Sequence, residues 1–134
     1  MNTEAIAKVI ENAVNAYWNK ESSWASSLSE VESATGFPRL VEFVESTVIH
    51  GDQTSGYAAE RITLHSQKRK VTNESEMLGL VKEIRACEGT EAYSDYLVDV
   101  FERHCKHPDR TDLIFYSEEE LSPSEIARLA WNGS

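Results

Sequence analysis

Helical spacing of apolar residues dominates the second half of the chain. Two stretches repeat apolar side chains every three or four residues, which places them on one face of a helix. The first stripe consists of Met77, Leu78, Val81 and Ile84, and the second of Tyr93, Leu97, Val100, Phe101 and His104. Asn73 with Glu76 has the spacing of a capping box at the start of the first helix. Glu88-Gly89 is expected to end that helix, and Thr90 can cap the second.

Two shorter elements complete this half. His107-Pro108 is predicted to end the second helix, because proline disfavours helical geometry in the residue before it. The Thr111 hydroxyl can then cap a short helical turn over residues 112–116. The run Ser122-Pro123-Ser124-Glu125 combines a cap, a first-turn proline and a capping-box acid. It begins a last helix with Ile126, Leu129 and Ala130 facing inward, so we predict a four-helix domain over residues 70–134.

The first half is less regular. One clear amphipathic helix is expected from Thr3 to about Asn19, with an apolar face made of Ile6, Val9, Ile10, Ala13, Val14 and Tyr17. Residues 21–37 show little periodicity, and a further element is expected from about Arg39. Residues 61–66 alternate apolar and polar side chains, so a short strand is an alternative to a helix there. We predict an all-α protein with a mostly helical region over residues 1–69.

A faint internal repeat links the two halves. Leu40, Val41, Glu42, Glu45, His50, Asp52 and Thr54 lie 57 residues before Leu97, Val98, Asp99, Glu102, His107, Asp109 and Thr111. A diverged tandem copy, joined near residues 68–70, would explain this spacing. The first helices of the two halves do not keep the offset, however, and no Asp-Leu-Ile motif follows Asp52. Residues 1–69 therefore remain a region of unknown role, with or without a common origin.

Charge narrows the class of partner. The chain has 134 residues and a formal net charge of −10. Residues 1–69 hold 9 acidic and 6 basic side chains, and residues 70–134 hold 14 acidic and 7 basic ones. Direct binding of nucleic acid needs clustered Lys and Arg, so this balance argues against it and favours a basic protein partner. An acidic excess that only maintains solubility is the alternative. No apolar run approaches the length of a membrane span.

Catalytic and metal-binding patterns are weak. His104 and His107 flank Cys105, but a zinc site needs about four placed ligands and no second cluster complements these residues. The chain has no nucleophile elbow, phosphate loop or dinucleotide fingerprint. We expect no enzyme activity, no cofactor and no metal. The N-terminus lacks a secretory signal pattern, which predicts a cytoplasmic protein whose two thiols, Cys87 and Cys105, are reduced and largely buried.

Residues 107–116 have the composition of a recognition surface. A turn of this length can bury Leu113 and Ile114 while it leaves Phe115 and Tyr116 near the surface, and exposed aromatic rings beside a carboxylate suit a protein interface. The alternative is that both rings belong to the core. On the preceding helix, Glu91, Asp95 and Glu102 surround Val98, and this face suits either a selective interface or plain solvent exposure.

The second half also resembles a known family, the colicin and pyocin DNase immunity proteins. The resemblance rests on four segments in the family's order and spacing: NESEMLGLVKEI (73–84), LVDVFERHCKHP (97–108), TDLIFY (111–116) and EEELSPSEIARLAW (118–131). Proteins of this family are small four-helix inhibitors that bind the nuclease domain of a bacteriocin. The resemblance therefore implies an immunity-protein-like bundle with a very short third helix.

The resemblance also implies roles for individual residues. In the family the third helix supplies the shared binding energy, which makes Asp112, Phe115 and Tyr116 the expected anchors. The second helix selects the nuclease, and the corresponding positions are Glu91, Ser94, Asp95, Val98, Glu102 and Thr111. Phe115 stands where the family usually has a tyrosine, so that hydroxyl is lost while the ring is kept. The last helix is also shorter than usual.

Two functions of different classes fit these observations. The first is a bacteriocin immunity protein that inhibits a cognate nuclease by exosite binding, with an RNase-type toxin as a variant of the same hypothesis. The second is a helical regulatory or adaptor protein that binds a non-nuclease partner, for which residues 1–69 are available. This N-terminal region could also form a homodimer.

Overall fold

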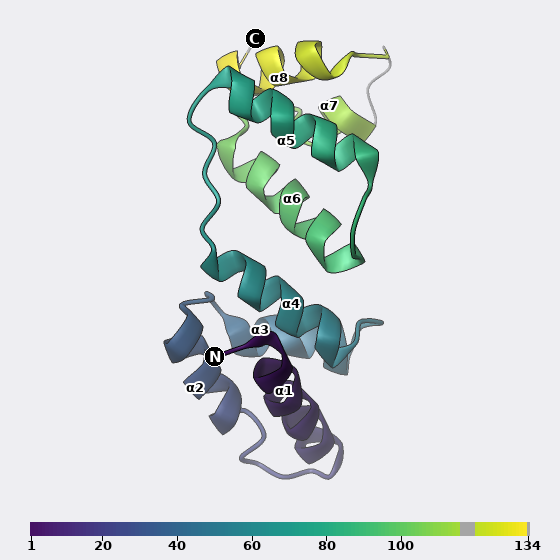
Figure 1. The fold of residues 1–134 in the computed structure, drawn as a ribbon. Helices are drawn as coiled ribbons and strands as arrows, with labels where there is room; N and C mark the ends of the chain where they lie inside the picture. The colour runs from purple at the N-terminus through teal and green to yellow at the C-terminus, as the bar shows by residue number, and fades with distance from the viewer. Residues whose placement is uncertain (116–119, 134) are drawn as a thin grey trace. The chain divides into compact units, whose positions relative to one another are not determined.

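The protein is helical throughout the part of the chain that its structure, a computed structural model, describes, which is residues 1–115 and 120–133. That part contains eight α-helices and one short π-helix, and no strand (Figure 1). The expected all-α class is therefore confirmed. The chain divides into two compact units, Met1–Lys68 and Arg69–Ser134.

The N-terminal unit is built on a pair of packed helices. Its elements are α1 (Thr3–Trp18), α2 (Ser26–Thr35), α3 (Leu40–Val44), the π-helix η1 (Glu45–Ile49) and α4 (Ser55–Ser66). Helix α1 packs against α4, and α2 contacts both α1 and α3. The core consists of Ile6, Ile10, Ala13, Leu28, Val31, Phe37, Leu40, Val44, Ala58, Ala59 and Ile62. Ile6 and Ile10 of α1 and Ala58 and Ala59 of α4 are all buried in this one cluster.

The structure decides two points in this unit that the sequence left open. Residues 21–37 contain helix α2, which buries Leu28 and Val31 and ends at Gly36 in the left-handed conformation, with φ 73°. Residues 61–66 are helical and form the second half of α4, whose N-cap Thr54 accepts a hydrogen bond from the Tyr57 N–H at 3.0 Å. Their apparent alternation is part of a longer helix rather than a strand.

The C-terminal unit contains the four helices that the sequence predicts. They are α5 (Glu74–Ala86), α6 (Glu91–His104), α7 (Asp112–Phe115) and α8 (Pro123–Asn132), and α5 packs against both α6 and α8 (Figure 1). The buried side chains are Val71, Met77, Leu80, Val81, Ile84, Ala92, Tyr96, Leu97, Val100, Phe101, Leu113, Ile126, Ala127 and Ala130. Asn73 and Thr90 cap α5 and α6, and Ser122 with Glu125 forms the complete capping box of α8.

Helix α6 ends earlier than predicted. Its last residue is His104, and Cys105 is already extended, with φ −77° and ψ 125°. The Lys106 N–H then donates a hydrogen bond of 2.7 Å to the Ala130 carbonyl of α8, and the Lys106 ammonium lies 4.1 Å from the centre of the Trp131 ring. These contacts with α8 hold the chain off the helix axis before Pro108 is reached.

A polar network joins the start of this unit to α5 and α6. The Arg69 guanidinium forms an ion pair with Glu83, and the Tyr93 hydroxyl donates to the same carboxylate at 3.1 Å. The Tyr96 hydroxyl accepts the Arg69 backbone N–H at 3.3 Å. The hydrogen bond from Arg69 holds the pKa of Glu83 below its usual value, and burial raises the pKa of Tyr93.

Replacing Glu83 with glutamine is expected to lower the free energy of unfolding at neutral pH by about 0.5 to 1 kcal/mol, because the pair is partly exposed and screened by water. Since the folded carboxyl has the lower pKa, its stabilising effect is complete above the ordinary carboxyl pKa and is lost as the pH falls through the folded value. Urea unfolding of both proteins at pH 7 and at about pH 3 measures this. The exposed Glu88 with the same change is the control, and an equal loss at both pH values would contradict the assignment.

Candidate functional site

The short helix α7 contains one buried side chain, Leu113, and one largely exposed ring, Phe115. The Leu113 side chain is 5% exposed, whereas Phe115 is 53% exposed. The Thr111 carbonyl accepts the N–H groups of Ile114 at 2.9 Å and Phe115 at 3.1 Å, which fixes the turn. The alternative that Phe115 belongs to the core is therefore wrong. Tyr116 lies outside the described residues, so the structure decides the exposure of Phe115 alone.

The loop before α7 is held by its own hydrogen bonds. The Asp109 N–H donates to Nδ1 of His107 at 3.1 Å, and the Arg110 N–H donates to the His107 carbonyl at 3.2 Å. The Asp109 carbonyl in turn accepts the Asp112 N–H at 2.9 Å. Arg110 adopts a left-handed conformation, with φ 45°, that turns the chain into α7. Successive bonds of this kind present Asp112 and Phe115 on a defined backbone.

The two cysteines differ in their environment. The Cys105 thiol donates to the His107 carbonyl at 3.6 Å, and burial raises its pKa. Cys87 is exposed at the left-handed C-cap of α5, with φ 52°. The expectation that both thiols are largely buried was therefore wrong for Cys87. Both cysteines are free.

Helix α6 carries the second group of candidate residues on the side away from its core. Tyr96, Leu97, Val100 and Phe101 are buried, whereas Glu91 is exposed and Ser94, Asp95, Val98 and Glu102 are half-buried. Positions 91, 95, 98 and 102 follow helical spacing, so they share one face. This stripe presents three carboxylates with Val98 between them. Thr111, which precedes α7, is half-buried, and Asp112, the first residue of α7, is exposed.

The candidate site thus has two parts on one unit, the stripe on α6 and the exposed residues of α7. Both have a net negative charge in their titratable side chains. Within residues 1–115 and 120–133, no three His, Cys, Asp or Glu side chains gather as metal ligands would. The part of the chain described also contains no helix that is long and apolar enough to span a membrane. This chemistry suits recognition of a cationic protein surface.

Comparison with known proteins agrees with the resemblance in the sequence. Residues 69–132 match a family model described as colicin immunity protein / pyocin immunity protein. The match begins at the first residue of the C-terminal unit and includes all four of its helices. Over this segment the chain is therefore similar to the colicin and pyocin immunity family, which confirms the resemblance found in the sequence. Neither curated proteins nor solved structures gave a significant match to the chain.

One group of surface residues was missed at the level of sequence. Tyr17, Trp18 and Trp24 line a pocket where α1 leads into α2. The helical spacing places Tyr17 on the apolar face of α1 and predicts no position for either tryptophan. The sequence does indicate an exposed tryptophan here, because Trp18 lies outside the apolar stripe of α1 and is followed by a polar segment.

Proposed function

We propose that this protein is a bacteriocin immunity protein that binds and inhibits the nuclease domain of its cognate toxin in the cytoplasm of the producing cell. The family match over residues 69–132 supports a bacteriocin immunity role. The observation that carries the finer proposal is Phe115, a large ring that is 53% exposed on a short, well-anchored helix. A nuclease that binds DNA or RNA has a basic surface, and the acidic unit complements it.

The proposed mechanism is exosite inhibition. Phe115 and Tyr116 pack on the nuclease, and Asp112 meets a basic residue of the toxin. The α6 positions Glu91, Ser94, Asp95, Val98 and Glu102, together with Thr111, select the partner. Hot spots of this kind are aromatic anchors surrounded by weaker polar contacts. Bound beside the catalytic centre, the acidic inhibitor excludes the nucleic acid backbone by its bulk and by charge repulsion, so neither metal nor cofactor is needed.

The charge of the C-terminal unit also predicts how the complex forms. An acidic surface attracts a basic nuclease over distance, so association is fast and slows as the salt concentration rises. The unit acts by binding, with no reaction of its own. Residues 1–69 and 70–134 are proposed to be separate domains, of which the second suffices for nuclease inhibition.

The test begins with the reading frames next to the gene. Each product is co-expressed with the full chain and assayed for cleavage of DNA and of RNA, with and without this protein. Stoichiometric loss of DNA cleavage supports the proposal, and loss of RNA cleavage alone changes the toxin class. A folded protein that binds a neighbouring toxin without lowering cleavage of either substrate would exclude inhibition. A stable complex with a non-nuclease product would favour the adaptor function instead.

A further inference from the structure

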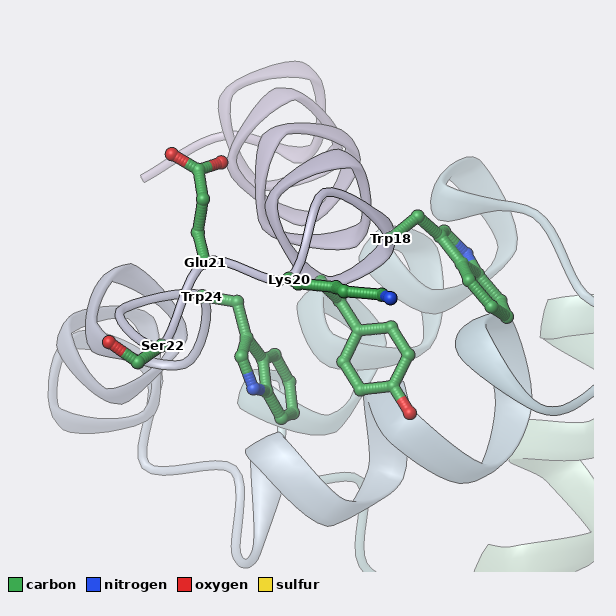
Figure 2. A pocket seen from close by; sticks show the side chains of 6 residues that line it. Trp18, Lys20, Glu21, Ser22 and Trp24 are labelled. Carbon is green, nitrogen blue, oxygen red and sulfur yellow. The ribbon is translucent and has the colours of Figure 1, made fainter.

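Three aromatic side chains line a surface pocket in the N-terminal unit, which lies outside the family match. They are Tyr17, Trp18 and Trp24, and the pocket is completed by Lys20, Glu21 and Ser22 (Figure 2). The Tyr17 ring meets each tryptophan edge to face, with centroids 5.2 Å apart in both pairs and interplanar angles of 89° and 86°. Both indole planes therefore stand nearly perpendicular to the ring between them.

The backbone and a histidine fix Tyr17 in place. Its hydroxyl lies 3.2 Å from Nε2 of His50, and the two rings meet edge to face at 5.6 Å. The loop after α1 is closed by the Lys20 N–H, which donates to the Tyr17 carbonyl at 3.0 Å, and by the Glu21 N–H, which donates to the Ala16 carbonyl at 3.0 Å. This part of the pocket is therefore preorganised, which lowers the entropic cost of binding.

The exposure of the Trp18 side chain is not explained by packing in the core of the N-terminal unit. Its side chain is 61% exposed, although Tyr17 and Trp24 beside it are half-buried. Tryptophan and tyrosine are enriched among the residues that dominate binding energy at protein interfaces. A largely exposed indole on a fixed aromatic base has the form of such an anchor.

We propose that this aromatic pocket is a second contact site for the toxin and receives an arginine- or lysine-bearing loop of that protein. The inference rests on the proposed function, which supplies a basic partner. Aromatic faces attract cations, and tryptophan does so most strongly. Residues 1–68 hold nine acidic and five basic side chains, a formal charge of −4, so the unit as a whole also favours a cationic partner.

Two contacts on one chain strengthen each other. Once the C-terminal unit holds the toxin, the pocket meets the basic loop at a high effective concentration, and even a weak contact then slows dissociation. The N-terminal unit would thereby add affinity and selectivity that the family's four-helix unit does not provide alone.

The charged neighbours Lys20 and Glu21 predict whether the occupant of the pocket is cationic or acidic. Figure 2 shows the Lys20 side chain extending toward Trp18, whereas the Glu21 carboxylate points away from the indoles. A cationic occupant is repelled by the Lys20 ammonium, so Lys20→Gln should tighten toxin binding and Glu21→Gln should weaken it. An acidic occupant requires the opposite pair of results.

The first experiment measures toxin affinity with the full chain. Trp18→Ala is expected to raise the Kd about 30-fold, with unchanged circular dichroism and unfolding, because the side chain contributes little to the core. The matched control is Asn12→Ala, a change at an exposed position of the same helix, and its Kd should equal that of the wild type. A Trp18→Ala protein that binds the toxin like the wild type would overturn the proposal.

The second experiment does not need the toxin, so the pocket and the proposed function can fail separately. The three indole N–H signals of the full chain are followed by NMR during titration with a short arginine peptide, and then with the same peptide containing citrulline. Arginine should shift the signals of Trp18 and Trp24 while Trp131 serves as the internal control, and neutral citrulline should not. Equal shifts with both peptides, or no shift with either, would refute cation recognition. Shifts that follow protein concentration alone, and disappear in Trp18→Ala, would assign the pocket to a second copy of the chain.

Discussion

Replacing Phe115 with alanine is expected to weaken binding of the cognate nuclease domain by about 2 kcal/mol or more, which is roughly a 30-fold rise in Kd. The same change should alter the free energy of unfolding by less than about 0.5 kcal/mol, because substitutions of exposed side chains rarely exceed this value. Phe115 is 53% exposed, so its ring contributes little to the core that Leu113 anchors beside it. Phe115→Ala is therefore expected to change the Kd strongly and the free energy of unfolding only slightly.

Calorimetry or competition for nuclease inhibition measures the first quantity, and urea unfolding measures the second. Phe115→Tyr is the informative companion variant, because it keeps the ring and restores the hydroxyl usual in the family, and binding should be retained. Tyr116→Ala tests the other proposed anchor, which lies outside the described residues. Unchanged nuclease binding by folded Phe115→Ala would remove α7 from the proposed interface.

Replacing Phe101 with alanine is expected to have the opposite profile, with a loss of about 3 to 5 kcal/mol in the free energy of unfolding of the C-terminal unit. Phe101 is 0% exposed and lies in the last turns of α6. Its carbonyl also accepts the N–H of Cys105 at 2.8 Å, at the point where the helix ends. Removal of the ring leaves a cavity that the surrounding helices fill only in part, and domains of this size have little stability to spare.

The measurement is a denaturant or thermal unfolding curve that distinguishes the two units. Trp131 reports on the C-terminal unit, and Trp18 with Trp24 reports on the N-terminal one. Phe101→Leu, which keeps most of the volume, should cost less than about 1.5 kcal/mol. A loss below about 1 kcal/mol in Phe101→Ala would mean that the ring is not the core residue that its burial indicates.

The elements with strong local signals were predictable from sequence. Helices α1, α5, α6 and α8 each combine an apolar stripe with a cap, and Asn73, Thr90 and Ser122 cap their helices as expected. The capping box predicted for Asn73 and Glu76 is not completed, because the Glu76 carboxylate accepts the Thr72 N–H at 2.9 Å. Helix α2 was missed because only Leu28 and Val31 are buried along its length, and it has no side-chain cap. Two buried residues in ten are too few for a recognisable period, and contacts with α1 and α3 stabilise the helix instead.

The candidate surfaces also differ in how far the sequence could predict them. The acidic stripe of α6 could be located from spacing alone, since residues on a helix face recur at fixed intervals. The position of Trp18 outside the apolar stripe of α1 could be seen in the sequence, but the pocket that it forms with Tyr17 and Trp24 could not, because that pocket depends on a loop that brings Trp24 back against α1. Roles in binding for Glu91, Ser94, Asp95, Val98, Glu102, Thr111, Asp112, Phe115 and Tyr116 stay predictions.

The amino-acid sequence by itself determined the helical class, the resemblance of the C-terminal unit to the immunity family and the start of most helices, because periodicity and caps are properties of residues close together in the chain. Only the tertiary structure decided that Phe115 is exposed and that α6 stops at His104. A four-residue helix is too short for its spacing to show which side chains face inward. The structure shows that Leu113 is buried and that Phe115 is exposed. Just after the end of α6, the Lys106 N–H donates a hydrogen bond to the Ala130 carbonyl, and these two residues are distant in the chain and meet only after α8 has packed.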